Sequence, residues 1–199
     1  MSKKESTFLN MVVTLFVITI VAGLSLGFVN QITLEPKAKA KLEKKVNGLK
    51  QVLPNFTNNP VEMVKLVKSD EAKDSIEMYP AFENENFVGA AVIGSSEKGF
   101  SGLIKIMVGF KPNGDVHNIV VLEQKETPGL GTKIKDDKFK QQYRDKNPST
   151  FNLKVTKDGG KVDALTGATI TTRAFSEAVE MAYNEFIMHK EVLTQAKEN

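Results

Sequence analysis

The residues best suited to chemistry lie in the run Asp-Ala-Leu-Thr-Gly-Ala-Thr at residues 163–169. Gly167 and Ala168 leave the backbone before Thr169 uncluttered, so a bulky group can approach the hydroxyl. An apolar pattern with helical spacing follows, and the free N–H groups and dipole at the start of a helix favour an anion. The run therefore predicts that Thr169 is an attachment point for a phosphate, with the charge of Arg173 nearby.

A plainer interpretation is that the threonines between residues 169 and 172 only cap this helix, which threonine often does. The helix is expected from about Thr172, because apolar residues recur at helical spacing at Ala174, Phe175, Ala178, Val179, Ala182, Tyr183 and Phe186. Taken alone, the run fits both capping and attachment.

A second run, Glu-Thr-Pro-Gly-Leu-Gly at residues 126–131, has the composition of a tight loop. Its glycines let main-chain amides come close to a planar ring. Residues 129–134 begin like a dinucleotide fingerprint but lack the third glycine, and residues 94–99 have Walker spacing without the lysine. His117 and His189 are too far apart in sequence to indicate a metal site. Neither a catalytic residue nor a metal site is predicted.

Together the two runs resemble the FMN-binding domain found in RnfG, a component of the Rnf electron-transfer complex, and in NqrC, a component of the sodium-translocating NADH:quinone reductase. The resemblance covers roughly residues 85–185 and includes a looser match at residues 99–102. It implies that Thr169 carries FMN through a phosphoester bond, installed by a flavin transferase that uses FAD as donor. Gln124 departs from the histidine that is expected at that position.

The resemblance also assigns roles to the neighbouring residues. Gly167 and Ala168 clear the approach to Thr169, while Thr166 and Thr171 are candidate hydrogen-bond donors to the phosphate. Asp163 opens the modification motif, and we expect it either to engage the transferase or to fix the turn. The loop beside the flavin is expected to comprise Glu126, Thr127, Gly129, Leu130 and Gly131.

Residues 8–29 form an uncharged, apolar run that is long enough to cross a membrane as a helix. It is also longer than the apolar core of a cleaved signal peptide. The lysines that follow, at residues 37–50, would place the next segment in the cytoplasm by a local charge count. The resemblance implies the opposite orientation, with the flavin domain outside the inner (cytoplasmic) membrane. We follow the resemblance, because whole domains translocate despite such charges.

The composition of the chain limits which kinds of partner and cofactor it can have. The net charge of +3 is small and the chain has only two arginines, Arg144 and Arg173, which argues against a nucleic-acid partner. The absence of cysteine excludes iron–sulfur clusters, zinc thiolate sites and disulfides. Electrons must therefore arrive from other subunits and leave to them, and membrane lipid is the remaining expected contact.

The expected fold class is α+β, a transmembrane helix followed by an antiparallel sheet flanked by helices. Short strands are predicted at residues 61–67, 87–93, 103–110 and 116–122, with a hairpin turn at 111–115 and a polar loop at 69–75. Helices are predicted after Pro36 as far as Pro54, at 136–144 and after Thr171. The expected segments are a cytoplasmic terminus (1–7), the membrane helix (8–29), a juxtamembrane helical linker (30–54) and the FMN-binding domain (55–199).

These features predict an electron-transfer subunit with covalent FMN in an ion-translocating Rnf complex, a part of an oxidoreductase rather than a complete enzyme. Three alternatives stay open. They are the NqrC component of the quinone reductase, an extracytoplasmic flavoprotein reductase acting on a small molecule, and a non-redox anchored binding module in which the threonines only cap a helix.

Overall fold

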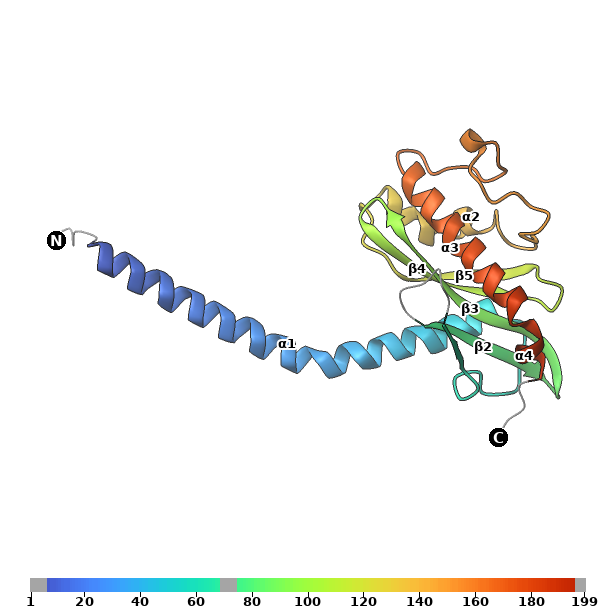
Figure 1. Ribbon diagram of the computed structural model, residues 1–199, viewed down its shortest axis with the longest axis horizontal. Coiled ribbons are helices and arrows are strands. Elements are labelled where there is room, and N and C mark those ends of the chain that lie inside the picture. The colour runs from blue at the N-terminus through green and yellow to red at the C-terminus, as the bar shows by residue number, and fades with distance from the viewer. Residues whose placement is uncertain (1–6, 69–74, 196–199) are drawn as a thin grey trace. The chain divides into compact units, whose positions relative to one another are not determined.

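The structure is a computed structural model that describes residues 7–68 and 75–195 (Figure 1). The described chain divides between Glu43 and Lys44 into two compact units, and each is described by itself. The polar loop predicted at 69–75 falls almost entirely outside the described residues.

A single helix, α1 (Phe8–Val52), begins the described chain. Its most apolar 18-residue window has a mean hydropathy of 2.5 and none of that window is buried, so the helix is long and apolar enough to cross a membrane. The predicted boundary between a membrane helix and a linker at residues 29 and 30 falls inside this helix, which also contains Pro36. The division into segments stays a prediction.

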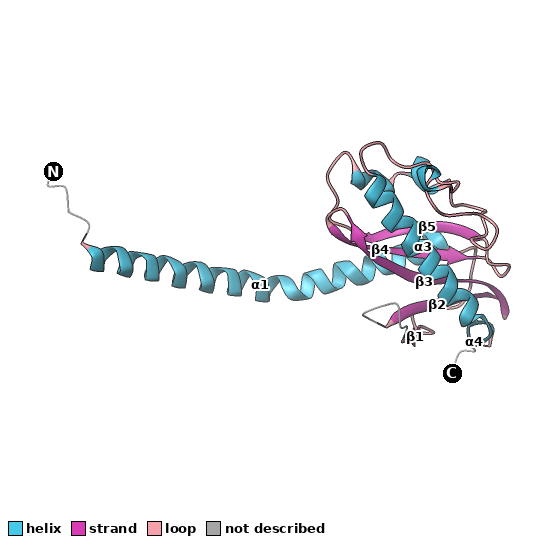
Figure 2. Cartoon of the chain, turned by 45° about the horizontal axis from the view of Figure 1, so that its top comes forward, coloured by secondary structure: helices cyan, strands magenta, loops and turns pink. Residues whose placement is uncertain are grey.

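The second unit is built on an antiparallel sheet in the order β1-β2-β3-β4-β5 (Figure 2). The strands are β1 (Lys65–Val67), β2 (Ile76–Glu83), β3 (Asn86–Gly99), β4 (Gly102–Phe110) and β5 (Val116–Glu123). Alternate residues of a strand face opposite sides. In β3, Ala90 and Val92 therefore belong to one core cluster and Ala91 and Ile93 to the other. The predicted α+β fold is confirmed.

Helices cover the two faces of the sheet. The long helix α3 (Thr169–Met188) crosses one face, as Figures 1 and 2 show, and buries Phe175 and Ala178 against it. A β-carbon added at Gly94 would lie 2.1 Å from the Ala178 carbonyl oxygen, so glycine is what allows helix and sheet to approach so closely. The end of α1 buries Leu49 and Val52 on the opposite face. Because both faces are covered, the strands are apolar almost throughout.

The predictions before β3 were partly wrong. Residues 61–67 form a strand only from Lys65, because Asn59 and Glu62 close a turn in which the Glu62 N–H donates to the Asn59 carbonyl (3.2 Å). Strand β2 was missed because it contains Pro80, and proline normally argues against an interior strand.

The side chain of Asn58 explains why Pro80 is tolerated. It donates to the Pro80 carbonyl (3.0 Å) and accepts from the Phe82 N–H (2.8 Å). Strand β1 pairs only with residues 76–78 of β2, so the edge of β2 at Pro80 has no neighbouring strand that would require an N–H from it. The Asn58 side chain therefore provides the hydrogen bonds to this edge of β2 that a neighbouring strand would otherwise provide.

A long connection links β5 to α3 and contains η1 (Gly131–Lys135), α2 (Asp137–Lys140) and η2 (Thr156–Asp158). The helix predicted at 136–144 ends at Lys140, because the chain turns to pair with β5. There the Asp145 N–H donates to the Val116 carbonyl (2.8 Å). The predicted hairpin at 111–115 is confirmed, with Gly114 at φ +90°. A short helix, α4 (Lys190–Thr194), follows α3.

A partly buried network of hydrogen bonds ties the end of α1 to β2 and gives a prediction about pH. Lys45 Nζ donates to both carboxylate oxygens of Glu77 (2.7 and 2.6 Å), and the Tyr79 hydroxyl donates to the same carboxylate. Burial raises the pKa of Glu77, but the hydrogen bonds from Lys45 and Tyr79 outweigh it and hold the pKa below the ordinary 4.5.

Because the pKa of Glu77 is lowered in the folded state, its stabilising effect is present above pH 4.5 and is lost as the pH falls through the folded-state value. We expect Glu77→Gln to lower the melting temperature at pH 7 and to have a much smaller effect at pH 3. Thermal melts followed by circular dichroism measure this, with the exposed Glu83→Gln as control. An equal effect of Glu77→Gln at both pH values would contradict the assignment.

Candidate functional site

Thr169 is the first residue of α3, three residues earlier than the sequence suggested. The N-cap residue is Ala168, and no side chain caps this end of the helix. The first intrahelical bond runs from the Thr172 N–H to the Ala168 carbonyl (3.0 Å), so the N–H groups of Thr169, Ile170 and Thr171 precede it. This end of the helix therefore presents free donors.

The Thr169 side chain itself is half-buried, and its hydroxyl makes no hydrogen bond within the described chain. The interpretation in which the threonines serve only as caps does not match this geometry, since the capping position lacks a side-chain oxygen. A free hydroxyl beside unpaired N–H groups is the arrangement that a phosphate ester at Thr169 needs.

The loop before α3 is closed from inside by Thr172, which sequence reasoning did not single out. Its buried hydroxyl accepts from the Leu165 N–H (3.1 Å) and donates to the Ala168 carbonyl (3.0 Å). Gly167 has φ +74°, a conformation that favours glycine, and the Ala168 N–H donates to the Leu165 carbonyl (2.9 Å). Residues 165–168 therefore form a hydrogen-bonded turn, and Thr169 follows it at the surface.

A contact from outside residues 163–169 holds the first residue of that run in place. The side-chain amide of Gln142 accepts from the Asp163 N–H (2.7 Å) and donates to the Asp163 carbonyl (3.3 Å). The Asp163 carboxylate is exposed and has no partner among residues 7–68 and 75–195. Gln142 thus holds the main chain of Asp163 while its side chain stays available.

Glu126 joins the two sequence runs. Only 4% of its surface is exposed. One carboxylate oxygen accepts from the Ser101 N–H (3.0 Å) in the turn between β3 and β4, and the other accepts from the Thr171 hydroxyl (2.5 Å) on α3. The Glu126 N–H donates to the Gln124 side chain (2.5 Å). Glu126 therefore holds three segments together and places a negative charge at the N-terminal end of α3, where the dipole favours it.

Two glycines make room for this carboxylate. A β-carbon at Gly131 would lie 2.7 Å from Glu126 Cβ and 2.9 Å from Thr171 Oγ1, and one at Gly99 would lie 2.8 Å from Glu126 Oε1. These distances are below any normal contact, so a side chain at either position would displace Glu126. Gly131 thus packs against Glu126, and its predicted place in the loop beside the flavin stays a prediction.

The loop beside Glu126 brings Leu130 to the modification motif. The Thr127 carbonyl accepts from the Leu130 N–H (3.2 Å), and Gly129 takes φ +75°. Leu130 Cδ2 lies 3.3 Å from the position that a β-carbon would occupy at Gly167. The two runs, about 40 residues apart in the chain, therefore meet beside Thr169.

Three apolar side chains stand exposed around this meeting point. Phe100 follows Gly99 in the turn fixed by Glu126, Leu130 lies on Gly167, and Ile170 follows Thr169. Their exposed fractions are 66%, 43% and 48%. Exposed apolar groups on three segments that Glu126 holds together indicate a surface that receives a ligand or a partner.

The other predicted residues are placed less directly. The Thr171 hydroxyl is buried and donates to Glu126, so in this structure it is directed away from the surface. Thr166 is exposed, and its hydroxyl is unpaired in the described part of the chain. Arg173 is held by Asp158 through two hydrogen bonds (2.7 and 2.8 Å), which raise the pKa of Arg173 and lower that of Asp158. Its charge is therefore largely neutralised.

Comparison with known proteins agrees with this geometry. Residues 99–184 match the sequence profile of the FMN-binding domain. The G component of the ion-translocating oxidoreductase complex of Aliivibrio fischeri is 34% identical over 194 residues, which cover 92% of this chain and 91% of the relative. The G component of the proton-translocating ferredoxin:NAD(+) oxidoreductase complex of Clostridium ljungdahlii is 30% identical, with 88% of both chains covered.

Among solved structures, the crystal structure of NqrC from Shewanella oneidensis superposes with a TM-score of 0.50 at 25% identity, covering 68% of this chain and 70% of that one. The domain is thus an FMN-binding domain. The chain belongs to the FMN-binding-domain family that includes the G components of the ion-translocating oxidoreductase complexes.

Proposed function

We propose that this chain is a membrane-anchored electron carrier with FMN covalently attached to Thr169, working in an ion-translocating ferredoxin:NAD oxidoreductase complex of the Rnf type. The observation that supports it most directly is the unpaired Thr169 hydroxyl at the uncapped start of α3. The names of the two relatives supply the complex and its substrates.

The residues present fit such a group. The free N–H groups at the start of α3 would hold the phosphate, and the closed turn at Gly167 and Ala168 leaves the approach open. The exposed side chains of Phe100, Leu130 and Ile170 would lie against the ring. When bound, FMN supplies the electron transfer, while the protein supplies position and electrostatics.

In this proposal α1 anchors the chain in the inner membrane by a single pass, with the flavin domain on the periplasmic or extracellular side. The apolar window of α1 supports the anchor. A flavin on that side must be installed by a separate flavin transferase, and a covalent bond keeps it from diffusing away. Membrane lipid and the other subunits of the complex are the lasting partners.

The NqrC component of the quinone reductase is the second candidate, because the NqrC structure has the same fold. Sequence identity favours the Rnf-type relative, since the Aliivibrio fischeri protein is 34% identical to this chain and the Shewanella oneidensis NqrC chain is 25% identical. Copurification of the native protein with its membrane neighbours would identify the complex.

Mass spectrometry tests the attachment directly. The full-length protein would be coexpressed with a flavin transferase, purified in detergent and digested. We expect a mass increase equal to FMN less one water on the peptide that contains Thr169. An unmodified peptide, or a modification on another residue, would overturn the proposal.

Asp163 gives a further prediction. Because its carboxylate is exposed and unpaired within the described chain while Gln142 holds its main chain, Asp163→Ala is expected to leave the melting temperature unchanged and to reduce flavin incorporation several-fold. In-gel flavin fluorescence measures incorporation. Full incorporation in Asp163→Ala would show that the carboxylate does not engage the transferase.

A further inference from the structure

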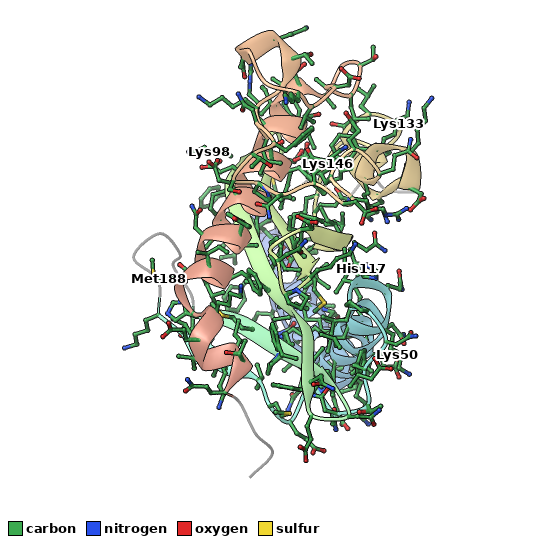
Figure 3. All side chains as sticks on the ribbon, turned by 90° about the vertical axis from the view of Figure 1, so that its right-hand side faces the viewer. Lys50, Lys98, His117, Lys133, Lys146 and Met188 are labelled. Atoms are coloured by element: carbon green, nitrogen blue, oxygen red, sulfur yellow. The ribbon has the colours of Figure 1, made fainter. Side chains whose placement is uncertain are left out.

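The segment that follows the Leu130 loop carries an excess of positive charge. Lys133 and Lys135 lie in η1 and Lys138 in α2, and all three side chains are exposed. None forms an ion pair with another described residue. Figure 3 shows Lys133 beside η1 and α2, and Lys98 across the view next to α3, where Lys98 pairs with Glu177 (2.5 Å).

Three acidic groups lie near these lysines, and among the described residues only Asp137 is paired, whereas the exposed Asp136 and the half-buried Glu123 beside Lys44 are not. Asp137 accepts two hydrogen bonds from Arg144, one of them at 3.0 Å, and lies 3.9 Å from Lys140. Lys44, at the end of α1, adds another cation. Burial lowers the pKa of Lys44, and the nearby charge of Lys135 lowers it further. We call Lys44, Lys133, Lys135 and Lys138 the basic surface.

The basic surface adjoins the site around Thr169. Gly131, the first residue of η1, packs against Glu126 and Thr171, which lies two residues after Thr169. The exposed Leu130 immediately precedes η1. A molecule seated on the basic surface would therefore lie beside the apolar side chains that surround Thr169.

We propose that the basic surface docks an acidic face of the protein that exchanges electrons with this chain, an inference that rests on the proposed function. Complementary charge steers association and fixes the orientation in which two proteins meet. Anionic lipid fits less well, because the exposed Asp136 carboxylate stands among the lysines. A sheet of headgroups would repel that carboxylate, whereas a protein face can place a donor opposite it.

The test uses charge reversal in the intact complex in membrane vesicles. The triple variant Lys133→Glu, Lys135→Glu, Lys138→Glu is compared with a control of the same charge change at exposed lysines elsewhere, Lys50→Glu, Lys65→Glu, Lys68→Glu. NADH serves as reductant, and stopped-flow absorbance follows flavin reduction at low and high salt. We expect the rate in the first variant to fall by about tenfold or more at low salt and to lose its salt dependence. The control should retain the wild-type rate.

Equal rates in the two triple variants would overturn the inference. A missing fluorescent flavin band in wild-type protein would instead overturn the proposed function, so the two failures are distinguishable. Zero-length carbodiimide coupling separates protein from lipid, because it joins an ammonium group to a carboxylate and gives no such product with a phosphate headgroup. Cross-links from these lysines to an identified protein of the complex are expected. Their absence would also overturn the inference.

Discussion

Replacing Thr169 with valine is expected to abolish covalent flavin while leaving the fold intact. Valine has nearly the shape of threonine but no hydroxyl, and the Thr169 hydroxyl makes no hydrogen bond within the described chain. Nothing in the described structure is therefore lost with it. After coexpression with a flavin transferase, a denaturing gel under blue light should show a fluorescent band for wild type and none for Thr169→Val.

Two controls make this result specific. Thr166→Val removes the exposed hydroxyl three residues earlier and should keep the fluorescent band, since Thr166 lies outside the helix start. Thr169→Ser keeps a hydroxyl and should retain at least part of the band. The melting temperatures of all three variants should match that of wild type. Fluorescence in Thr169→Val equal to wild type would place the linkage elsewhere.

The second large effect is expected at Glu126. Glu126→Ala removes the acceptor of the Ser101 N–H and of the buried Thr171 hydroxyl, and both donors would be left without a partner. Thr171 is buried whereas Ser101 is exposed, and an unsatisfied buried donor costs about 1–3 kcal/mol, so we expect a loss of about 1–3 kcal/mol in the free energy of unfolding. Urea unfolding of protein made without the transferase, followed by tyrosine fluorescence in detergent, measures this.

Matched variants separate the buried contact from loss of charge in general. Glu126→Gln keeps one acceptor oxygen and should cost about 1–2 kcal/mol. Glu180→Gln removes an exposed carboxylate on α3 and should change stability by less than about 0.5 kcal/mol. With the transferase present, Glu126→Ala should also incorporate less flavin, because Leu130 and the start of α3 are no longer held together. A stability loss in Glu126→Ala no larger than that in Glu180→Gln would contradict the role of Glu126.

Elements that depend on a local residue pattern could be predicted from the sequence. The apolar run of α1, the short apolar runs of β3 to β5 and the helical spacing after Thr172 each reflect a short-range rule, and the structure follows them. The same holds for the turn at Gly167, where the motif called for small residues and the structure has Gly167 at φ +74°. Strand β2 was missed because the contact that accommodates Pro80 comes from Asn58, more than 20 residues away.

The interior of the site depends on contacts that no local pattern contains. Glu126 meets Thr171 across 45 residues, and Gln142 meets Asp163 across 21. The sequence predicted Glu126 in the loop beside the flavin and Thr171 as a donor to the phosphate, and both roles stay predictions, but it gave no sign that the two side chains are hydrogen-bonded to each other. A buried pair of this kind becomes visible only when the turn between β3 and β4, the Leu130 loop and α3 are assembled.

The two hydrogen bonds between the Gln142 side chain and the Asp163 main chain bear on whether folding or flavin attachment comes first. Gln142 lies outside the modification motif, and so do Glu126 and Ser101, so a nascent or extended peptide carrying that motif lacks the geometry that presents the acceptor oxygen. If Thr169 carries FMN as proposed, we therefore expect flavin loading to follow folding. With the domain on the outer side of the membrane, as also proposed, loading would follow export as well.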